Sequence, residues 1–189
     1  MLRRTAFSPT VLLLAVLFFL GLNVKSAYAD WYGWLPNFRG IVENGRNEIL
    51  LSGYAWHDPA SYSAAARAQL NSFAFGGGYE RYIINSDGST ELLSGIVFAD
   101  SYRKPQITVG YTKYWSAKVV DNLSLGLGYT AALSRREDAF HGFPEPIVLP
   151  VGVVTIAERF QIYATYIPPL PRALHLRGDV AIIFAGVRF

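Results

Sequence analysis

Large apolar residues alternate with small or polar ones over long stretches of this sequence. In NLSLGLGYT, residues 122–130, leucine and tyrosine take every second position, while serine, glycine and threonine take the positions between them. The same alternation runs through QITVGYTKYW, residues 106–115, and FQIYATY, residues 160–166. Successive side chains of a β-strand point to opposite faces, so these segments are predicted strands with one large apolar face. Two folds fit this pattern: a membrane barrel, with lipid outside and a narrow lumen inside, and a soluble sandwich of two sheets.

The connections between the predicted strands favour the barrel. An even number of strands, with short turns on one rim and longer loops on the other, is typical of outer-membrane barrels. The predicted connections alternate in this way, for example from DPASYSAAARAQL to NSDGS. A strand that ends on an aromatic residue is a further feature of such barrels, and this sequence ends on Phe189. We predict eight strands, at residues 48–57, 71–84, 90–100, 106–118, 122–133, 147–155, 157–167 and 179–189.

The first 29 residues have the composition of a secretory signal peptide. Arg3 and Arg4 precede an apolar run at residues 11–22, and the segment ends on AYA at Ala29. A basic start, a short apolar run and a small-residue end form the pattern that signal peptidase cuts. The run is too short to span a bilayer comfortably, which disfavours the alternative of an uncleaved anchor. We therefore expect residues 1–29 to be removed on export to a Gram-negative outer membrane.

Removing this segment balances the charge of the chain. The sequence has 17 Lys and Arg against 14 Asp and Glu, and the first 29 residues hold Arg3, Arg4 and Lys25 but no acidic residue. The remainder lacks the basic excess of a nucleic-acid-binding protein, so we expect no nucleic-acid partner. The absence of cysteine excludes a disulfide framework and thiol chemistry. About 160 residues remain, the size of one domain.

The exported chain divides into a short N-terminal segment and the barrel. Residues 30–47 form a periplasmic or interfacial segment, and a helix there would place Trp34, Phe38, Ile41 and Val42 near one face. Proline and glycine within the segment weaken a helix, so an extended leader is the alternative. Residues 48–189 are predicted to form the barrel. The predicted fold is therefore all-β: an eight-stranded antiparallel transmembrane β-barrel preceded by a short N-terminal amphipathic helix.

A histidine, an aspartate and a serine gather on one rim of the predicted barrel. His57 ends the first predicted strand, and Asp100 and Ser101 end the third. Neighbouring strands are about 5 Å apart, so these two ends are predicted to lie about 10 Å apart before the loops bend inward. An imidazole that accepts a serine proton and is oriented by an acid is equipment for acyl transfer. The alternative, a set of solvated loop residues, is the one that geometry alone favours.

Other polar residues on the long-loop rim have plainer interpretations. His141 and His175 match no metal-binding spacing, so we interpret them as solvated loop histidines and predict no metal site. The mixed charge cluster at residues 135–138 has two interpretations of equal weight, a contact with lipid phosphates and an ordinary polar loop.

Short motifs are spread along the chain from residue 38 to residue 168. They are FR at 38–39, WH at 56–57, GGG at 76–78, F-x-DS at 98–101, LGLG-x-TA at 125–131, LP at 149–150, FQ at 160–161 and TYIP at 165–168. In this order the sequence resembles the lipid A palmitoyltransferases of Gram-negative outer membranes, the PagP-type enzymes. The specificity of the resemblance lies in the shared order of the motifs over most of the exported chain.

The resemblance implies a fold and an activity. Enzymes of this family are eight-stranded antiparallel barrels preceded by a short amphipathic helix. They transfer a palmitoyl chain from the sn-1 position of a glycerophospholipid to lipid A of lipopolysaccharide, a modification linked to antimicrobial peptide resistance. The expected partners are therefore a membrane phospholipid as acyl donor and lipid A as acceptor, for a monomer without a cofactor.

The resemblance also implies which residues act. The functional histidine, aspartate and serine of the family match His57, Asp100 and Ser101. The family's chain-length-setting glycine, at the floor of an interior acyl pocket, matches Gly110. The alternation independently puts Gly110 on the small-residue face, inside the lumen. A larger side chain there is expected to shorten the acyl group that fits.

Prolines suggest where lipid enters the barrel. A closed ladder of hydrogen bonds excludes lipid, and proline breaks the ladder because it has no N–H donor. Pro150 and Pro168 match family prolines that flank a lateral opening. At the other lateral gap of the family, Ser52 and Ala74 stand where prolines are expected, which argues against a second route.

Two other functions remain open at this stage. A non-catalytic small outer-membrane barrel, serving adhesion or membrane stability, would share the signal peptide and the alternation but would not need three reactive groups on one rim. A lipid A deacylase would share the histidine and serine chemistry, but it would release free fatty acid.

Overall fold

The computed structural model describes residues 36–137, 142–168 and 179–189, without the side chain of Ser52. The predicted signal peptide, Asp138, and the histidines His141 and His175 lie outside the described residues. No helix among the described residues is long and apolar enough to cross a membrane. The elements, in chain order, are α2 (Phe38–Asn44), β1 (Arg46–His57), α3 (Ala64–Gln69), β2 (Phe73–Ile84), β3 (Ser89–Ala99), β4 (Pro105–Val120), β5 (Leu123–Arg135), β6 (Glu145–Ile156), β7 (Phe160–Ile167) and β8 (Val180–Arg188).

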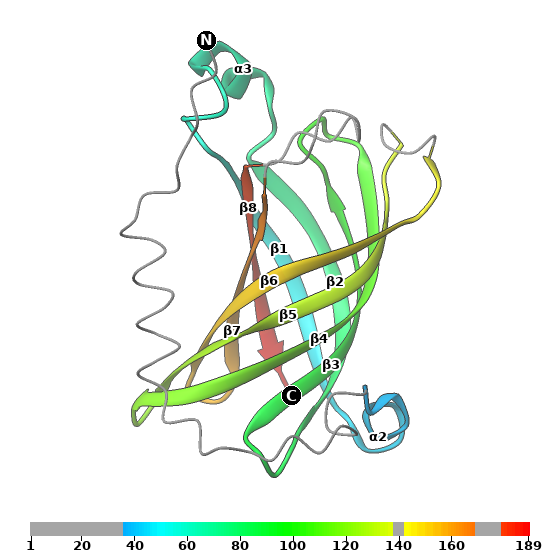
Figure 1. Ribbon diagram of the computed structural model, residues 1–189, viewed down its shortest axis with the longest axis vertical. Coiled ribbons are helices and arrows are strands. Elements are labelled where there is room, and N and C mark those ends of the chain that lie inside the picture. Colours follow the sequence, from blue (N-terminus) through cyan, green and yellow to red (C-terminus); the bar gives the residue numbers. More distant parts are fainter. Residues whose placement is uncertain (1–35, 138–141, 169–178) are drawn as a thin grey trace. The chain divides into compact units, whose positions relative to one another are not determined.

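The eight strands close into one antiparallel barrel, as the sequence predicts. Each strand pairs with its neighbours in sequence, and β1 also pairs with β8. Short turns join β2 to β3, β4 to β5 and β6 to β7 at one rim, and longer connections occupy the other (Figure 1). Strand β7 begins at Phe160, three residues after the predicted bound. Ala157 and Glu158 have φ of 50° and 58°, left-handed values that form the very short turn predicted at these two residues.

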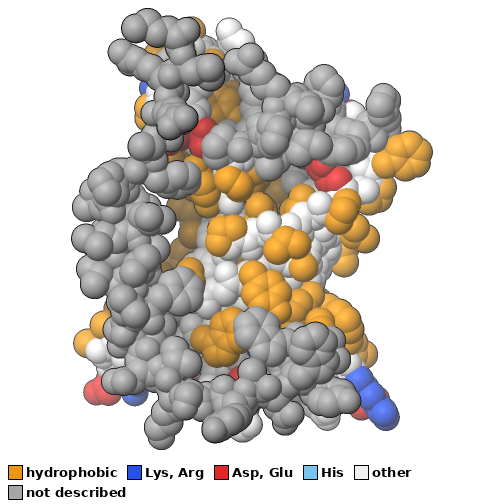
Figure 2. Space-filling model, in the orientation of Figure 1, with side chains coloured by type: hydrophobic (Ala, Val, Ile, Leu, Met, Phe, Trp, Pro, Cys, Tyr) orange, Lys and Arg blue, Asp and Glu red, His pale blue; other side chains and the backbone are white. Residues whose placement is uncertain are grey.

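Large apolar side chains cover the outside of the barrel, and both polar and apolar side chains line its lumen. Thr108, Thr112 and Thr130 line the lumen, on the face that the alternation predicts. In the view of Figure 2, apolar side chains spread over the wall between the two rims, while charged side chains lie near its ends. The structure is therefore the barrel and not the alternative sandwich of two sheets, in which the large apolar faces would be buried against each other. Exposed apolar residues of the outer wall include Ile49, Leu51, Phe75, Val97, Val109, Leu133, Val148 and Ile162.

A short helix precedes the barrel, which decides between the helix and the extended leader. The side chain of Asn37 accepts a hydrogen bond from the Gly40 N–H at 2.9 Å and caps the first turn of α2. Ile41 is completely buried where α2 meets β2 and β3, whereas Val42 is 60% exposed. The Phe38 ring also contacts the Tyr111 ring of β4, at 5.6 Å between centroids, and Trp34 of the predicted apolar face lies outside the described residues.

Two charged side chains of the outer wall hold α2 at the short-turn rim. Glu91 of β3 accepts a hydrogen bond from the Asn37 N–H at 2.9 Å. Arg81 of β2 donates to the carbonyl oxygens of Ile41, at 3.3 Å, and Gly45, at 2.6 Å. The Ile41 carbonyl oxygen also accepts from the Gly45 N–H at 3.0 Å, so the Arg81 guanidinium reinforces the C-terminal end of α2.

A buried polar cluster fills the lumen on the side of the short turns. The Arg188 Nε donates to Glu48 Oε2 at 3.0 Å, and Arg188 Nη2 donates to the Tyr114 hydroxyl at 2.7 Å. The Tyr163 hydroxyl donates to Glu48 Oε1 at 2.9 Å, and the Arg188 guanidinium lies 4.1 Å from the centre of the Tyr82 ring. Glu48 and Arg188 are 0% and 8% exposed, so this ion pair is held inside the barrel and not in water.

Candidate functional site

His57 and Ser101 contact each other at the long-loop rim. The distance between His57 Nε2 and Ser101 Oγ is 2.9 Å, a hydrogen bond that joins the end of β1 to the turn after β3. His57 is 4% exposed, and its ring meets the Tyr62 ring edge to face at 5.4 Å between centroids. An imidazole nitrogen in contact with a hydroxyl can accept its proton, which is the arrangement that acyl transfer requires.

Asp100 holds a turn and does not orient the histidine. Its Oδ1 accepts hydrogen bonds from the N–H groups of Tyr102 and Lys104, both at 2.8 Å. Its Oδ2 is buried, lies 3.8 Å from Arg136 Nε, and has no hydrogen-bond partner among the described residues. The Asp100 carboxylate therefore does not have the predicted role of an acid that orients the imidazole. The carboxylate instead fixes the backbone loop that carries Ser101.

Two further residues support this loop, and sequence reasoning did not identify their roles. The Asn71 N–H donates to the carbonyl oxygen of Ser101 at 2.8 Å, and Asn71 Nδ2 donates to that of Asp100 at 3.2 Å. Arg136, from the predicted charge cluster, reaches Asp100 across the mouth of the barrel. Both residues come from loops next to the site, where sequence alone gives no spacing that would reveal the contact.

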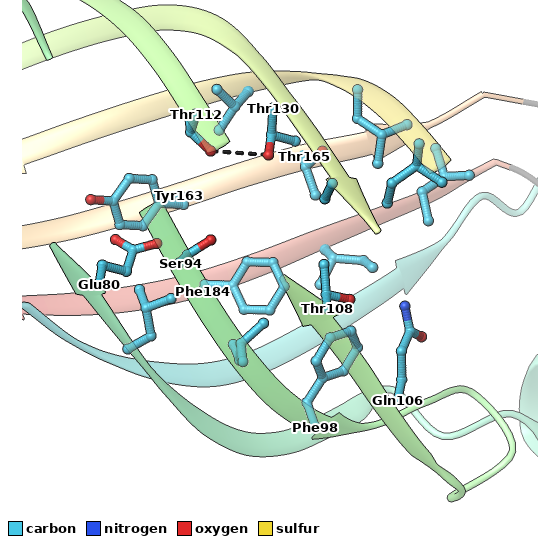
Figure 3. Close-up of a pocket in the computed structure, with 18 residues that line it drawn as sticks. Glu80, Ser94, Phe98, Gln106, Thr108, Thr112, Thr130, Tyr163, Thr165 and Phe184 are labelled. Carbon is cyan, nitrogen blue, oxygen red and sulfur yellow. Dashed lines mark hydrogen bonds between the residues drawn. The ribbon is translucent and has the colours of Figure 1, made fainter. Parts of the chain in front are cut away.

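The reactive pair opens onto a cavity inside the barrel. The mouth pocket contains His57, Ser101 and Arg136, and it shares Phe98 and Gln106 with the cavity in the lumen. The lumen cavity encloses about 750 Å³ of space free of protein atoms, part of it open to solvent. Figure 3 shows Phe98 and Gln106 at one end of the cavity and Glu80 and Tyr163 at the other. Its apolar wall includes Leu50, Ile96, Phe98, Leu149, Val151 and Phe184.

Gly110 stands in the inward-facing row of β4, between Thr108 and Thr112. It pairs with Ala132 of β5, which lines the lumen cavity. A Cβ added at Gly110 would lie 2.6 Å from the Cβ of Ala132 and 3.1 Å from the carbonyl oxygen of Ala131. The space beside Gly110 is therefore occupied by Ala131 and Ala132, and a side chain at position 110 would displace this part of β5.

The backbone ladder between β6 and β7 stops short of the long-loop rim, where the Thr165 hydroxyl donates to the Pro150 carbonyl oxygen at 2.9 Å. Among the described residues, the β6–β7 ladder runs from Ile156 and Phe160 only as far as Val151 and Thr165. Residues 145–150, which form the part of β6 nearer the long-loop rim, pair with β5 but not with β7. Pro150 is the first residue of β6 beyond the ladder, and Pro168 follows the last residue of β7. Proline has no N–H to extend such a ladder, so both positions suit an opening in the wall.

The seam between β1 and β2 differs from that gap. Its ladder continues past an irregularity at Ser52 and Tyr54 to the pair Tyr54 and Phe73, and Ala55 N–H donates to the Ser72 carbonyl oxygen at 2.9 Å. This continued pairing agrees with the absence of prolines at Ser52 and Ala74.

Among the described residues, no group of three histidine, cysteine, aspartate or glutamate side chains is placed to hold a metal ion.

Sequence comparisons relate the chain to known proteins. The family described as "Antimicrobial peptide resistance and lipid A acylation protein PagP" matches residues 37–186. The chain is 34% identical over 160 residues to the lipid A acyltransferase PagP of Bordetella parapertussis, which covers 82% of this chain and 87% of that protein. It is 35% identical over 150 residues to the protein of the same name from Legionella pneumophila strain Paris, which covers 79% of this chain and 78% of that protein. The outer membrane protein Ail of Yersinia pestis covers 77% of this chain and 99% of its own, with a TM-score of 0.42 and 13% identity, a likeness too distant to inform the site.

Proposed function

Because the chain belongs to the PagP family and is an acyltransferase, we propose that it transfers a palmitoyl chain from the sn-1 position of a glycerophospholipid to lipid A. The observation that carries this proposal is the contact of His57 with Ser101 at the mouth of an apolar lumen cavity. A straight hydrocarbon chain fits a lumen of this kind, and each methylene group that it buries is worth about 0.8 kcal/mol. The ester carbonyl of the chain would then lie beside the reactive pair.

Two chemical routes start from this pair. In one, His57 takes the proton of Ser101, the serine oxygen attacks the sn-1 ester, and a lipid A hydroxyl later releases the acyl group from Ser101. In the other, His57 takes the proton of the lipid A hydroxyl, which attacks the ester directly. Both routes break the sn-1 ester bond, return the proton to the leaving glycerol oxygen and release a lysophospholipid. Mass spectrometry of the enzyme with phospholipid alone separates them, because only the first leaves a palmitoyl group on Ser101.

The apolar outer wall supports a position in the outer membrane of a Gram-negative bacterium, where both lipids are present. The gap between β6 and β7 offers a path by which a lipid in the bilayer reaches the mouth without passing the aqueous rim. Pro150 and Pro168 are therefore proposed to flank the lateral entry. A single closed barrel needs no second copy to complete this site, which supports a monomer.

The test follows a radiolabel on the sn-1 palmitoyl chain of phosphatidylcholine. Purified, folded protein is mixed with this lipid and with lipopolysaccharide in detergent micelles. We expect the label to move to lipid A. Label that appears as free palmitate would instead indicate a lipase or deacylase, and label that stays on the phospholipid would indicate a non-catalytic barrel.

Asp100 is expected to act through the turn that it holds. Asp100→Asn keeps an oxygen that can accept the N–H groups of Tyr102 and Lys104, whereas Asp100→Ala removes it. We therefore expect Asp100→Asn to retain clearly more transfer than Asp100→Ala, measured as kcat at saturating lipid. Removing a hydrogen-bond acceptor from a buried loop costs about 1–3 kcal/mol, or up to roughly a hundredfold in rate if the whole effect reaches Ser101. Equal losses in both variants would show that the charge, and not the turn, is what matters.

Gly110 is expected to influence the length of the acyl chain. In Gly110→Ala the new methyl group meets Ala132, which must shift towards the lumen that it lines. We expect a preference for shorter donor chains, with the relative rate changing by about fourfold for each methylene group displaced, since each is worth about 0.8 kcal/mol. The double variant Gly110→Ala with Ala132→Gly removes the collision and should restore the parental preference. A chain-length profile that is the same in all three proteins would contradict a role for Gly110.

A further inference from the structure

A carboxyl group lies at the far end of the lumen cavity, away from His57 and Ser101. Glu80 projects from β2 into the cavity, and Figure 3 shows it beside Tyr163 and Ser94, at the opposite end from Gln106. Glu80 is 4% exposed. Glutamate is rarely buried to this degree unless it is paired, so this position calls for an explanation.

Glu80 shares Tyr163 with another carboxylate and has no ion pair of its own in the part of the chain that the structure describes. Glu80 pairs across the β1–β2 ladder with Glu48, and Glu48 accepts from both Arg188 and Tyr163. One guanidinium therefore faces two carboxyl groups and forms its ion pair with Glu48. The Oε2 atom of Glu80 is buried and has no hydrogen-bond partner among the described residues. The Glu48–Arg188 ion pair forms without a contact to Glu80 Oε2.

Strand register connects Glu80 to the wall near Gly110. Ser94 of β3 pairs with Glu80 on one side and with Gly110 on the other, and Gly110 pairs with Ala132. These four inward-facing residues form one row across β2, β3, β4 and β5.

On the basis of the proposed acyl transfer, we propose that Glu80 ends the acyl pocket and sets the longest chain that the enzyme accepts. If the end of the acyl chain packed against Glu80 Oε2, it would exclude water from this oxygen, which has no other hydrogen-bond partner among the described residues. Burying a polar atom in this way is unfavourable. The chain must therefore stop short of Glu80 and leave room for the water that such an oxygen needs. The Glu80 side chain therefore limits the length of the acyl chain through its polarity as well as its size.

Three substitutions at Glu80 separate polarity from size. Glu80→Gln keeps length and polarity, Glu80→Leu has a comparable size but is apolar, and Glu80→Ala is small and apolar. Each variant is refolded as the full barrel and assayed with phosphatidylcholines whose sn-1 chains increase stepwise in length, with lipid A as acceptor. Glu43→Gln serves as the control, because Glu43 is a carboxylate on α2 outside the lumen that pairs with Arg39.

We expect Glu80→Gln and Glu43→Gln to keep the parental length limit. Glu80→Leu should accept longer chains and Glu80→Ala longer ones still, with the relative rate rising by about fourfold for each added methylene group that becomes buried. If Leu and Gln give the same limit, polarity does not set it and the proposal is wrong; should Glu80→Leu fail to fold, Glu80→Met, which is also apolar and of comparable size, takes its place in the comparison with Gln. Failure of the parental protein to transfer any chain would refute the proposed function instead, which keeps the two outcomes distinct.

Discussion

Replacing Ser101 with alanine is expected to reduce acyl transfer by about 10²–10⁴-fold, the range that proton transfer by a positioned group contributes. The Ser101 hydroxyl is the group in contact with His57 Nε2 at 2.9 Å, and alanine removes it without adding bulk. His57→Ala should give a loss of similar size, because His57 accepts a proton in both proposed routes. Transfer of labelled palmitate to lipid A under saturating lipid measures kcat for each variant.

The double variant provides the sharper comparison. If His57 and Ser101 act as one unit, removing both should cost little more than removing either one. Ser63→Ala is the matched control, since Ser63 lies on the same rim but its hydroxyl only caps α3 by accepting from the Ala66 N–H at 3.2 Å. This control should transfer at the parental rate. Normal transfer by both His57→Ala and Ser101→Ala, in barrels that resist unfolding as the parent does, would remove these residues from the mechanism.

The features that depend on alternation could be predicted from the sequence. A strand has a period of two, so the large residues of QITVGYTKYW and NLSLGLGYT determine the outer face, and Gly110 must then face inward with Thr108 and Thr112. Strand parity likewise places the ends of β1 and β3 on one rim. The predicted separation of about 10 Å between strand ends is compatible with the observed contact, because both side chains turn towards each other from those ends.

The role of Asp100 could not be predicted in the same way. Its position next to Ser101 fits an acid that orients a histidine, but a carboxylate can also accept backbone N–H groups two and four residues further on, as Asp100 does. Which of these occurs depends on the path of a short loop in which Arg103 takes a left-handed φ of 64°. Sequence patterns of strands carry no information about such a loop.

The buried charges were equally hidden. Glu48 and Arg188 are separated by 140 positions, and only the closure of β1 on β8 brings them together. A signal did exist, because Glu48, Glu80 and Arg188 all fall at positions that face the lumen once the barrel is drawn. Charged residues at inward positions of predicted strands could therefore have indicated a polar cluster, although not which carboxylate would pair with the arginine.

The apolar cavity and this polar cluster divide the lumen into two parts with different requirements. The part next to His57 must be open enough to admit a hydrocarbon chain, so few contacts between opposite strands can stabilise it. The part around Glu48 and Arg188 is filled with mutually hydrogen-bonded side chains and joins β1, β4, β7 and β8. We therefore expect the polar cluster to contribute strongly to the stability of the barrel, although it takes no part in the chemistry.

Arg188→Met is accordingly expected to destabilise the folded barrel by about 3–5 kcal/mol, the range for removing one partner of a buried ion pair. Glu48 is 0% exposed, so loss of the guanidinium leaves its carboxylate buried without a cation. The measurement is urea unfolding of the refolded protein in lipid vesicles, followed by tryptophan fluorescence. Arg39→Met is the control, because the Arg39–Glu43 pair on α2 has side chains 86% and 53% exposed, and such surface pairs contribute only about 0–1 kcal/mol.

The second variant, Glu48→Gln combined with Arg188→Met, distinguishes the uncompensated charge from the loss of packing. Glutamine is neutral and can still accept the hydrogen bond of the Tyr163 hydroxyl, so the double variant should recover most of the stability lost in Arg188→Met alone. If the double variant is as unstable as the single one, the arginine acts through its contacts with Tyr82 and Tyr114 and not through its charge. A change below about 1 kcal/mol in Arg188→Met would show that the cluster behaves like a surface ion pair despite its burial.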